Sequence, residues 1–348
     1  MVPEDLIQML LPIAFSGTGR AEGNGKVREW WELEHSTRFI ATTDRLSAFD
    51  RVLAHVPFKG QVLNELSAFW FRQTADIIDN HLISVPDPHC SVVRLAKPLP
   101  IEVVVRGYIT GVTSTALWRR YELGERVIYG QRFPEGMRKN QKLPRPIITP
   151  TTKGGQTGHD ERLEPREVVE QGCLDAHTWS AVQDAAIALF ERGAEVAIRA
   201  GLILVDTKYE FGLKPDGRLM LIDEVHTPDS SRFWLASSYA ERFEAGQEPE
   251  SRDKEFVRLA YAEKGYRGEG EPPRMPDALW VQASLIYQDL YERLTGMDFV
   301  PSAYPVEGRV LEALARERAV RKGVEVGEDE LQRKKSARDS GSASRNGD

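Results

Sequence analysis

The sequence has few cysteines, no long apolar run and no excess of basic residues. Two cysteines in 348 residues are too few for a disulfide framework or a zinc site. The lack of an apolar run of about 20 residues predicts no membrane span. With 46 Lys and Arg against 53 Asp and Glu, and no basic stripe, general nucleic-acid binding is not expected. These features favour a protein of the reducing cytoplasm.

Standard nucleotide-binding and nucleophile motifs are missing as well. The glycine-rich segment 17–29, GTGRAEGNGKVRE, has Arg20 where a P-loop needs glycine, and Val27 after Lys26 where it needs Ser or Thr. Its backbone N–H groups are suited to cradling a phosphate, although its composition fits a flexible loop equally well. The pair His159 and Asp160 lacks an accompanying activated Ser or Cys, so covalent catalysis is not predicted.

The spacing of apolar residues predicts a mixed fold. Several predicted strands, such as 38–43 and 102–106, are joined by turns rather than helices, which favours α+β over a doubly wound parallel sheet. The Pro- and Gly-rich segment 130–166 predicts a long functional loop, and the polar residues 323–348 predict a disordered tail. Helical periodicity is found over 62–79, 113–121, 179–200, 278–294 and 306–320.

Segment 201–234 carries charges where a buried strand would be apolar. It predicts two strands joined by a turn at 215–217 and followed by a polar loop. Because alternate strand residues share a face, Asp206, Lys208 and Glu210 point one way, which predicts a wet functional cleft. The residues expected to face the core are Ile203, Val205, Thr207 and Tyr209.

Strand geometry limits which of these charges can share a ligand. Asp206 and Glu210 lie about 13 Å apart along the strand, too far to bind one metal ion. The turn brings Asp223 within a residue or two of Glu210, on strands about 4.8 Å apart. Glu210 and Asp223 are therefore the expected Mg²⁺ ligands, and Asp206 and Lys208 face another part of a long anionic ligand such as ATP. The alternative is an exposed strand face with cross-strand ion pairs.

Several sequence blocks occur in an order typical of one enzyme family. LVDTKYEFG at 204–212 and IDEVHTPDSSRFW at 222–234 are the most specific. The others are GKVRE (25–29), TDRLSAFDRVL (43–53), KGQVLNELSAFWF (59–71), LPIEVVVRGYITG (99–111), NQKLPRPIITPTTK (140–153), HDE (159–161) and DKEFVR (253–258). Together they resemble the phosphoribosylaminoimidazole-succinocarboxamide synthase, or SAICAR synthetase, family.

The resemblance implies both an architecture and an activity. It implies a small kinase-like, β-rich nucleotide-binding domain over 1–100 and a larger ATP-grasp-like catalytic domain with C-terminal helices over 101–322. It implies an ATP-dependent amide ligase of purine biosynthesis, with ATP and Mg²⁺ as cofactors. The substrates would be carboxyaminoimidazole ribonucleotide (CAIR) and L-aspartate, joined through an acyl phosphate to give SAICAR, ADP and phosphate. The oligomeric state, monomer or homo-oligomer, stays open.

The resemblance also implies roles for individual residues. The expected ATP-binding residues are Lys26, Lys208, Glu210 and Asp223, and the last two hold Mg²⁺. The expected substrate-binding residues are Arg106, Ser114, Asp206, Asp229, Arg232 and Arg258. The expected catalytic residues are Lys208, Asp206 and Arg106. Weaker candidates around the cleft are Asp44, Arg45, Ser47, Asp50, Lys59, Lys153, His159 and Asp160.

One block departs from the family pattern. The family normally has Thr-Gly-Ser, whereas this chain continues from Gly111 with Val112, Thr113 and Ser114. Ser114, or else Thr113, is the expected replacement for the displaced hydroxyl. The departure leaves room for a paralogous ligase acting on another carboxylate and amine. A small-molecule kinase and a non-catalytic binding protein are further alternatives.

Overall fold

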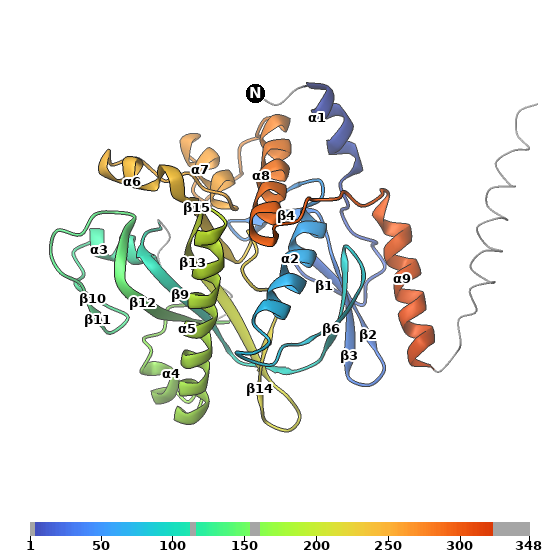
Figure 1. Cartoon of the computed structure of the whole chain (residues 1–348), viewed down its shortest axis with the longest axis horizontal. Coiled ribbons are helices and arrows are strands. Elements are labelled where there is room, and N and C mark those ends of the chain that lie inside the picture. The colour runs from blue at the N-terminus through green and yellow to red at the C-terminus, as the bar shows by residue number, and fades with distance from the viewer. Residues whose placement is uncertain (1–3, 112–115, 154–160, 323–348) are drawn as a thin grey trace, which may run out of the picture.

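The computed structural model describes residues 4–111, 116–153 and 161–322. It combines two large antiparallel sheets with flanking helices, which confirms the α+β prediction (Figure 1). The predictions for Val112, Thr113, Ser114, His159, Asp160 and the tail concern residues outside these ranges.

The first sheet is built from the N-terminal part of the chain. Its strand order is β1 (Gly23–Asn24), β2 (Arg28–Leu33), β3 (Thr37–Thr42), β7 (Cys90–Arg94) and β6 (Leu82–Asp87). Trp31 and Phe39 of this sheet pack against Val306 and Val310 of the C-terminal helix α9 (Val306–Arg321). Helix α9 therefore completes the core of the N-terminal sheet, beside which it lies in Figure 1.

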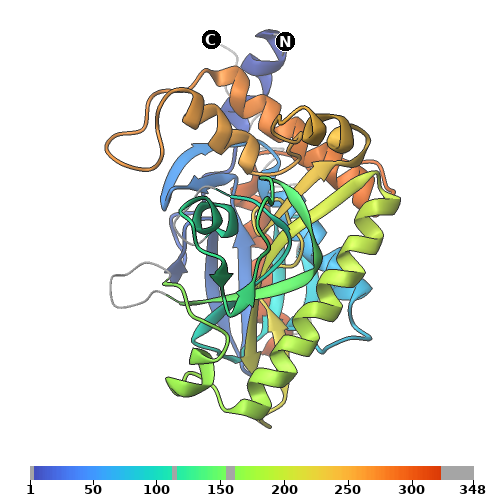
Figure 2. The same ribbon diagram turned by 90° about the vertical axis from the view of Figure 1, so that its left-hand side faces the viewer.

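The second sheet has a long central strand, β13 (Leu202–Leu213), and carries most of the charged candidates. Its strand order is β12 (Gln141–Thr152), β9 (Ile101–Ile109), β13 and β14 (Leu219–Ile222), while β15 (Ser231–Leu235) and β8 (Lys97–Pro98) also pair with β13. Helix α5 (Ala176–Arg199) runs along one face of this sheet (Figure 2). Helices α2 (Lys59–Gln73) and α8 (Asp277–Thr295) pack against each other in the large core shared with this sheet.

Shorter elements complete the described part of the chain. They are α1 (Glu4–Leu10), η1 (Leu11–Ile13), β4 (Arg45–Ala48), β5 (Arg51–His55), α3 (Leu117–Glu122), β10 (Val127–Ile128), β11 (Gln131–Arg132), α4 (Glu167–Glu170), α6 (Ala236–Glu244) and α7 (Glu255–Glu263).

Two sequence predictions of loops were wrong. The predicted loop 130–166 contains β12, a twelve-residue strand that pairs with β9. Its prolines are tolerated because β12 lies at the edge of the sheet, where a missing N–H breaks no ladder on the open side. The predicted polar loop after β14 contains β15, so Ser231 and Arg232 belong to a strand.

One predicted helix ends earlier than expected. The prediction extended over 62–79, whereas α2 ends at Gln73.

A local irregularity in β13 changes which side chains reach the core. The pairing of β13 with β15 shifts register between Leu204 and Asp206. Val205 packs with Tyr108 and Trp234, whereas Leu204 and Tyr209 belong to the large core. The expectation that Val205 shares a face with Tyr209 was therefore wrong, because a bulge reverses the alternation at this point.

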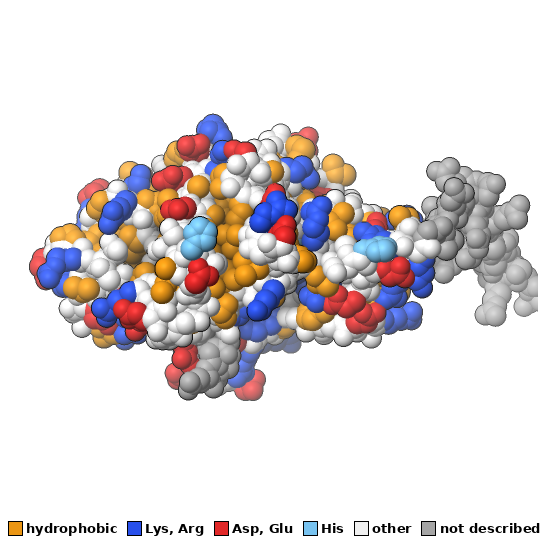
Figure 3. Space-filling view, turned by 90° about the horizontal axis from the view of Figure 1, so that it is seen from below, with side chains coloured by type: hydrophobic (Ala, Val, Ile, Leu, Met, Phe, Trp, Pro, Cys, Tyr) orange, Lys and Arg blue, Asp and Glu red, His pale blue; other side chains and the backbone are white. Residues whose placement is uncertain are grey.

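The surface carries charges of both signs. On the face seen from below, acidic and basic side chains alternate with apolar ones (Figure 3). Within the described ranges, no helix has the length and apolar character that a membrane crossing requires.

Candidate active site

The predicted acidic pair is formed where β13 and β14 meet. Glu210 pairs in register with Ile222, so Asp223 follows directly beside it. Asp223 has a left-handed backbone, with φ of 67°. Aspartate tolerates this region better than most residues, and such local strain is typical of functional sites. The hairpin geometry thus brings the two carboxylates together as the sequence predicted.

Lys208 lies at the centre of this acidic cluster. Its Nζ is 2.5 Å from Oε1 of Glu210, 2.9 Å from Oε1 of Glu102 and 3.8 Å from Oδ2 of Asp223. Lys153 forms a second ion pair with Glu210. Burial lowers the pKa of Lys208, but the charges of Asp223, Glu210 and Glu102 outweigh it and hold the pKa above that of an ordinary lysine. Lys208 is therefore a permanent cation at neutral pH.

Arg28, on β2 of the first sheet, is the main cation that the sequence reasoning missed. Its guanidinium forms an ion pair with Asp223 and lies 2.9 Å from Oε2 of Glu224. Burial raises the pKa of Asp223, but Arg28 and Lys208 outweigh this and hold it below the usual range. The sequence offered no spacing signal for this contact, because Arg28 and Asp223 are 195 positions apart.

Lys26, by contrast, is not brought to the acidic pair. Its Nζ lies 2.5 Å from Oδ1 of Asp50, and the two side chains are 58% and 62% exposed. An exposed pair of this kind leaves the lysine free to move, because it contributes little stability. The segment 25–29 therefore reaches the cluster through Arg28 rather than through Lys26.

The donor set at this cluster fits a magnesium ion bound together with a nucleotide. Glu210 and Asp223 supply the carboxylate oxygens that Mg²⁺ prefers, and both side chains are mostly buried, at 10% and 25% exposure. In the described ranges, no group of three or more His, Cys, Asp or Glu side chains is arranged to hold a metal alone. Mg²⁺ characteristically takes one or two carboxylates and completes its shell with phosphates and water.

A second cluster lies further along β13. Oδ2 of Asp206 is 3.3 Å from Nη1 of Arg106 on β9 and 3.2 Å from Nη1 of Arg232 on β15. Both arginines are directly opposite Asp206 in the strand registers. Nε of Arg106 also donates to Oγ1 of Thr149, at 2.9 Å. The sheet therefore aligns two guanidinium groups on one carboxylate, which is a suitable arrangement for recognising a phosphate.

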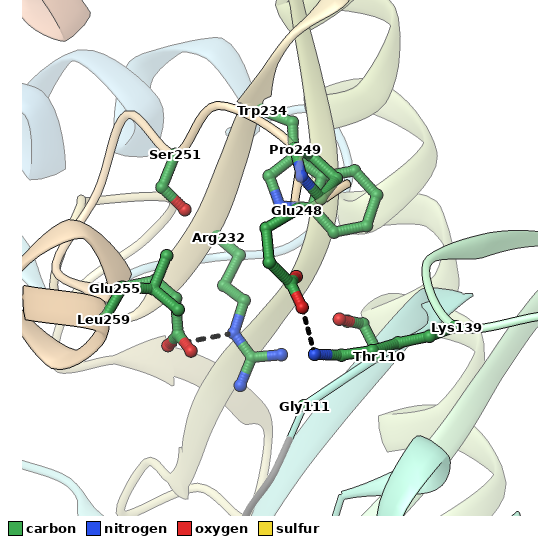
Figure 4. Close-up of a pocket in the computed structure, with 10 residues that line it drawn as sticks. All are labelled: Thr110, Gly111, Lys139, Arg232, Trp234, Glu248, Pro249, Ser251, Glu255 and Leu259. Carbon is green, nitrogen blue, oxygen red and sulfur yellow. Dashed lines mark hydrogen bonds and ion pairs between the residues drawn. The ribbon is translucent and has the colours of Figure 1, made fainter. Parts of the chain in front are cut away.

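Arg258 is linked to this cluster through α7. Oε2 of Glu255 is 2.9 Å from Nη1 of Arg258 and 3.6 Å from Nε of Arg232. Two of the predicted substrate-binding arginines thus share one carboxylate. Arg232 and Glu255 both line a small pocket (Figure 4).

Asp229 occupies a third, deeply buried position. Its Oδ2 is 2.8 Å from Nζ of Lys59 and 3.8 Å from Nζ of Lys254, and its Oδ1 accepts from Oη of Tyr287 at 2.9 Å. Burial raises the pKa of Asp229, but the two lysines outweigh it and lower the pKa to about 2. Burial lowers the pKa of Lys254 and the negative charge of Asp229 raises it. Burial has the larger effect, and the resulting pKa is about 8.

A family-level comparison shows which proteins this chain is related to. The model of the SAICAR synthetase family matches residues 22–273, which is most of the chain. The chain belongs to the SAICAR synthetase family. The family prediction made from the sequence blocks is therefore confirmed.

Named SAICAR synthetases are similar over most of their length. The phosphoribosylaminoimidazole-succinocarboxamide synthase of Legionella pneumophila (strain Paris) is 50% identical over 296 residues, covering 84% of this chain and 94% of that protein. The chloroplastic enzyme of Arabidopsis thaliana is 48% identical, covering 82% and 70%. The SAICAR synthase of Saccharomyces cerevisiae complexed with SAICAR is 32% identical with a TM-score of 0.68, covering 80% and 95%.

The structure brings together most of the predicted SAICAR synthetase site residues in two groups. Lys208, Glu210 and Asp223 form one group; Arg106, Asp206, Arg232 and Arg258 form the other. Asp229 lies with Lys59 and Lys254, and Lys26 lies apart. The individual roles of these residues stay predictions. Arg28, Glu102, Glu255 and Tyr287 were not predicted as site residues. Arg28, Glu102 and Tyr287 contact partners from distant parts of the chain, and Glu255 lies three residues before Arg258 but reaches Arg232 only through the fold.

Proposed function

We propose that the protein is the ATP-dependent ligase that joins CAIR and L-aspartate to give SAICAR, ADP and phosphate. The observation that carries this proposal is the pair of charged clusters on one face of β13, in a chain of the SAICAR synthetase family. One cluster is built for a metal-bound polyphosphate and the other for an anionic ribonucleotide. A single strand therefore aligns two substrates for a reaction between them.

The chemistry needs positioning and charge neutralisation rather than a nucleophilic side chain. A carboxylate oxygen of CAIR takes the γ-phosphoryl group of ATP, and ADP leaves. The aspartate amine then attacks the acyl carbon, the bond from carbon to the phosphate oxygen breaks, and the amine loses its proton. Phosphate is a far better leaving group than oxide, so holding both reactants in register accounts for most of the rate.

On the ATP side, Glu210 and Asp223 are the residues that would hold Mg²⁺. When bound, the ion would neutralise charge on the phosphate oxygens. Lys208 supplies a fixed positive charge beside the same oxygens, and Arg28 orients Asp223. For Lys26 to contact the phosphates, its ion pair with Asp50 has to break first.

On the ribonucleotide side, Arg106 and Arg232 present guanidinium groups that are oriented by Asp206. Arg258 adds a cation on the neighbouring helix, and Asp229 orients Lys254 and Lys59. Anchoring the substrate far from its reacting carboxylate limits the motion of that carboxylate relative to the γ-phosphate. Arg106, Asp206 and Lys208 lie on the paired strands β9 and β13, from which both clusters are built, and they are our candidates for the residues closest to the reaction.

The division of labour between the two parts of the chain is also a proposal. Strands of the first sheet fall within 23–94 and those of the second within 97–235, which supports a boundary near residue 100. We assign the activity to the cytoplasm, where the free thiols of Cys90 and Cys173 would stay reduced.

The test is ADP release from the purified protein with Mg-ATP, with CAIR and L-aspartate added separately and together. Release that requires both, with SAICAR appearing in equal amount, is the expected result. Release with CAIR and a different amine would indicate a paralogous ligase. Release with a hydroxyl acceptor and no amine would indicate a kinase. A folded protein that binds Mg-ATP but turns over neither would overturn the proposal.

A further inference from the structure

The pocket beside Arg232 contains a second cation that no predicted role uses. Lys139, which precedes β12, and Arg232 on β15 point into the same space (Figure 4). Two carboxylates, Glu248 and Glu255, also line this pocket. Glu255 lies beside Nε of Arg232, and Glu248 forms an ion pair with Lys139. The pocket thus contains two separate cations, each already matched by an acid of the same protein.

The backbone around Lys139 is held firmly. Asn140 is almost fully buried and accepts from Oγ1 of Thr110 at 2.6 Å. It has a left-handed backbone, with φ of 67°, and its carbonyl accepts from Oη of Tyr239 at 2.8 Å. Nδ2 of Asn140 also donates to Oε2 of Glu248 at 3.1 Å. Lys139 is therefore presented to the pocket from a rigid point, while its side chain stays movable.

The carboxylate of Glu248 is the movable partner. The side chains of Lys139 and Glu248 are 29% and 46% exposed, so their ion pair is partly solvated. Such a pair contributes little net stability and is easily exchanged for another anion. The carboxylate of Glu255, by contrast, is only 14% exposed and also serves Arg258. A ligand anion would therefore displace Glu248 and leave Glu255 in place.

We propose that Lys139 binds the phosphate group of the ribonucleotide substrate together with Arg232, and that Glu248 is the counter-ion this phosphate displaces. The inference rests on the proposed function and adds a phosphate-binding residue to it. A phosphate monoester is nearly a dianion at neutral pH, so it matches two cations where a single carboxylate matches one. Arg232 offers a planar fork of donors, and Lys139 offers a flexible point charge on the other side of the pocket.

The test compares Lys139→Met with Lys139→Arg and Glu248→Gln in steady-state kinetics. We expect Lys139→Met to raise the KM for CAIR about tenfold or more, as for the loss of one charge-assisted hydrogen bond, with the KM values for ATP and L-aspartate within twofold. Lys139→Arg should restore most of the loss. Glu248→Gln should lower the KM for CAIR, because it removes the competing carboxylate. A rise in the KM for L-aspartate instead of CAIR would overturn the proposal.

Arg138 and Glu244 provide matched controls next to the pocket. Nη2 of Arg138 lies 2.9 Å from Oε1 of Glu244, and neither residue lines the pocket. Arg138→Met removes a positive charge one residue from Lys139, and Glu244→Gln removes a negative charge four residues from Glu248. Because neither side chain lines the pocket, both variants should leave every KM within twofold. An equal effect of Arg138→Met and Lys139→Met would reduce the role of Lys139 to general electrostatics and overturn the proposal.

A binding measurement separates this inference from the proposed function. Calorimetry with ribose 5-phosphate, and with ribose as its uncharged counterpart, requires no turnover. Weaker binding of ribose 5-phosphate by Lys139→Met and tighter binding by Glu248→Gln support the phosphate site even if CAIR and L-aspartate are not joined. Unchanged binding in Lys139→Met, beside wild-type binding that depends on the phosphate, overturns the site even if the ligase activity is present.

Discussion

Nζ of Lys59 lies 2.8 Å from Oδ2 of Asp229, although the two residues are 170 positions apart in the chain. Their side chains are 0% and 4% exposed. Lys59 is the first residue of α2, and Asp229 lies between β14 and β15. This buried ion pair joins α2 to the loop between two strands of the second sheet. It also fixes the loop from which Asp229 reaches Lys254.

We expect Asp229→Asn to destabilise the protein strongly. Removing one partner leaves the ammonium of Lys59 buried without its counter-ion, which costs about 3–5 kcal/mol. Urea denaturation of the wild type, Asp229→Asn, Lys59→Met and the double variant measures this as a double-mutant cycle. The double variant should be more stable than Asp229→Asn alone. Additive losses would show that the two charges do not depend on each other.

The same pair predicts an acid-side dependence of stability. The pKa of Asp229 is lowered to about 2 from 3.8, so its contribution is complete above pH 3.8 and is lost as the pH falls through about 2. Asp229→Asn should therefore have a flatter dependence of unfolding free energy on pH between 4 and 2. Equal slopes for wild type and variant would contradict this assignment.

We expect Glu210→Gln to abolish most turnover while leaving the fold intact. The change removes a carboxylate charge from the proposed Mg²⁺ site and leaves Lys208 and Lys153 without this partner. ADP release should fall about a hundredfold or more, and the Mg²⁺ concentration needed for half-maximal rate should rise. Circular dichroism checks the fold. Glu241→Gln, an exposed position on α6, is the matched control and should behave as the wild type.

Arg28 should be more important for ATP than Lys26. Arg28→Met removes the cation that contacts both Asp223 and Glu224, so we expect the KM for ATP to rise about tenfold or more. Lys26→Met removes one exposed ion pair with Asp50 and should change the same constant less than threefold. The reverse order would mean that Lys26 leaves Asp50 and binds ATP, as the family resemblance implied.

Lys254 should give the reaction an alkaline limit near pH 8. Burial is the largest cause that lowers its pKa, Arg258 and Lys59 also lower it, and Asp229 and Glu224 raise it, which leaves a pKa of about 8. Above that pH the ammonium is lost, and its attraction for an anionic substrate is lost with it. Lys254→Arg keeps the charge, so its kcat/KM should stay level to pH 9 while that of the wild type falls.

The sign of the accompanying stability change provides an independent check on Lys254. Between about pH 8 and 10.5 the unfolded chain binds more protons than the folded one, so the unfolding free energy should rise with pH. Chemical denaturation of the wild type and Lys254→Arg at pH 8 and 10 tests this. A wild-type change identical to that of Lys254→Arg would show that Lys254 titrates normally.

The sequence by itself determined the family, the α+β class and the local pairing of Glu210 with Asp223. These depend on patterns within short segments, because the alternation of a strand and the reversal at a turn act over only a few residues. For the same reason, the predicted helix 278–294 lies within α8. The sequence reasoning failed where context reversed a local preference, as with the prolines of β12, which only an edge position tolerates.

Only the tertiary structure decided which charges meet across long stretches of chain. Arg28 reaches Asp223 from another sheet, and Lys59 reaches Asp229 over 170 positions, so no spacing rule relates either pair. The local pattern also did not predict that Lys26 lies exposed beside Asp50 and away from the acidic pair. Which partner a charge finds depends on how the core packs the sheets and helices together, and that packing is a property of the whole chain.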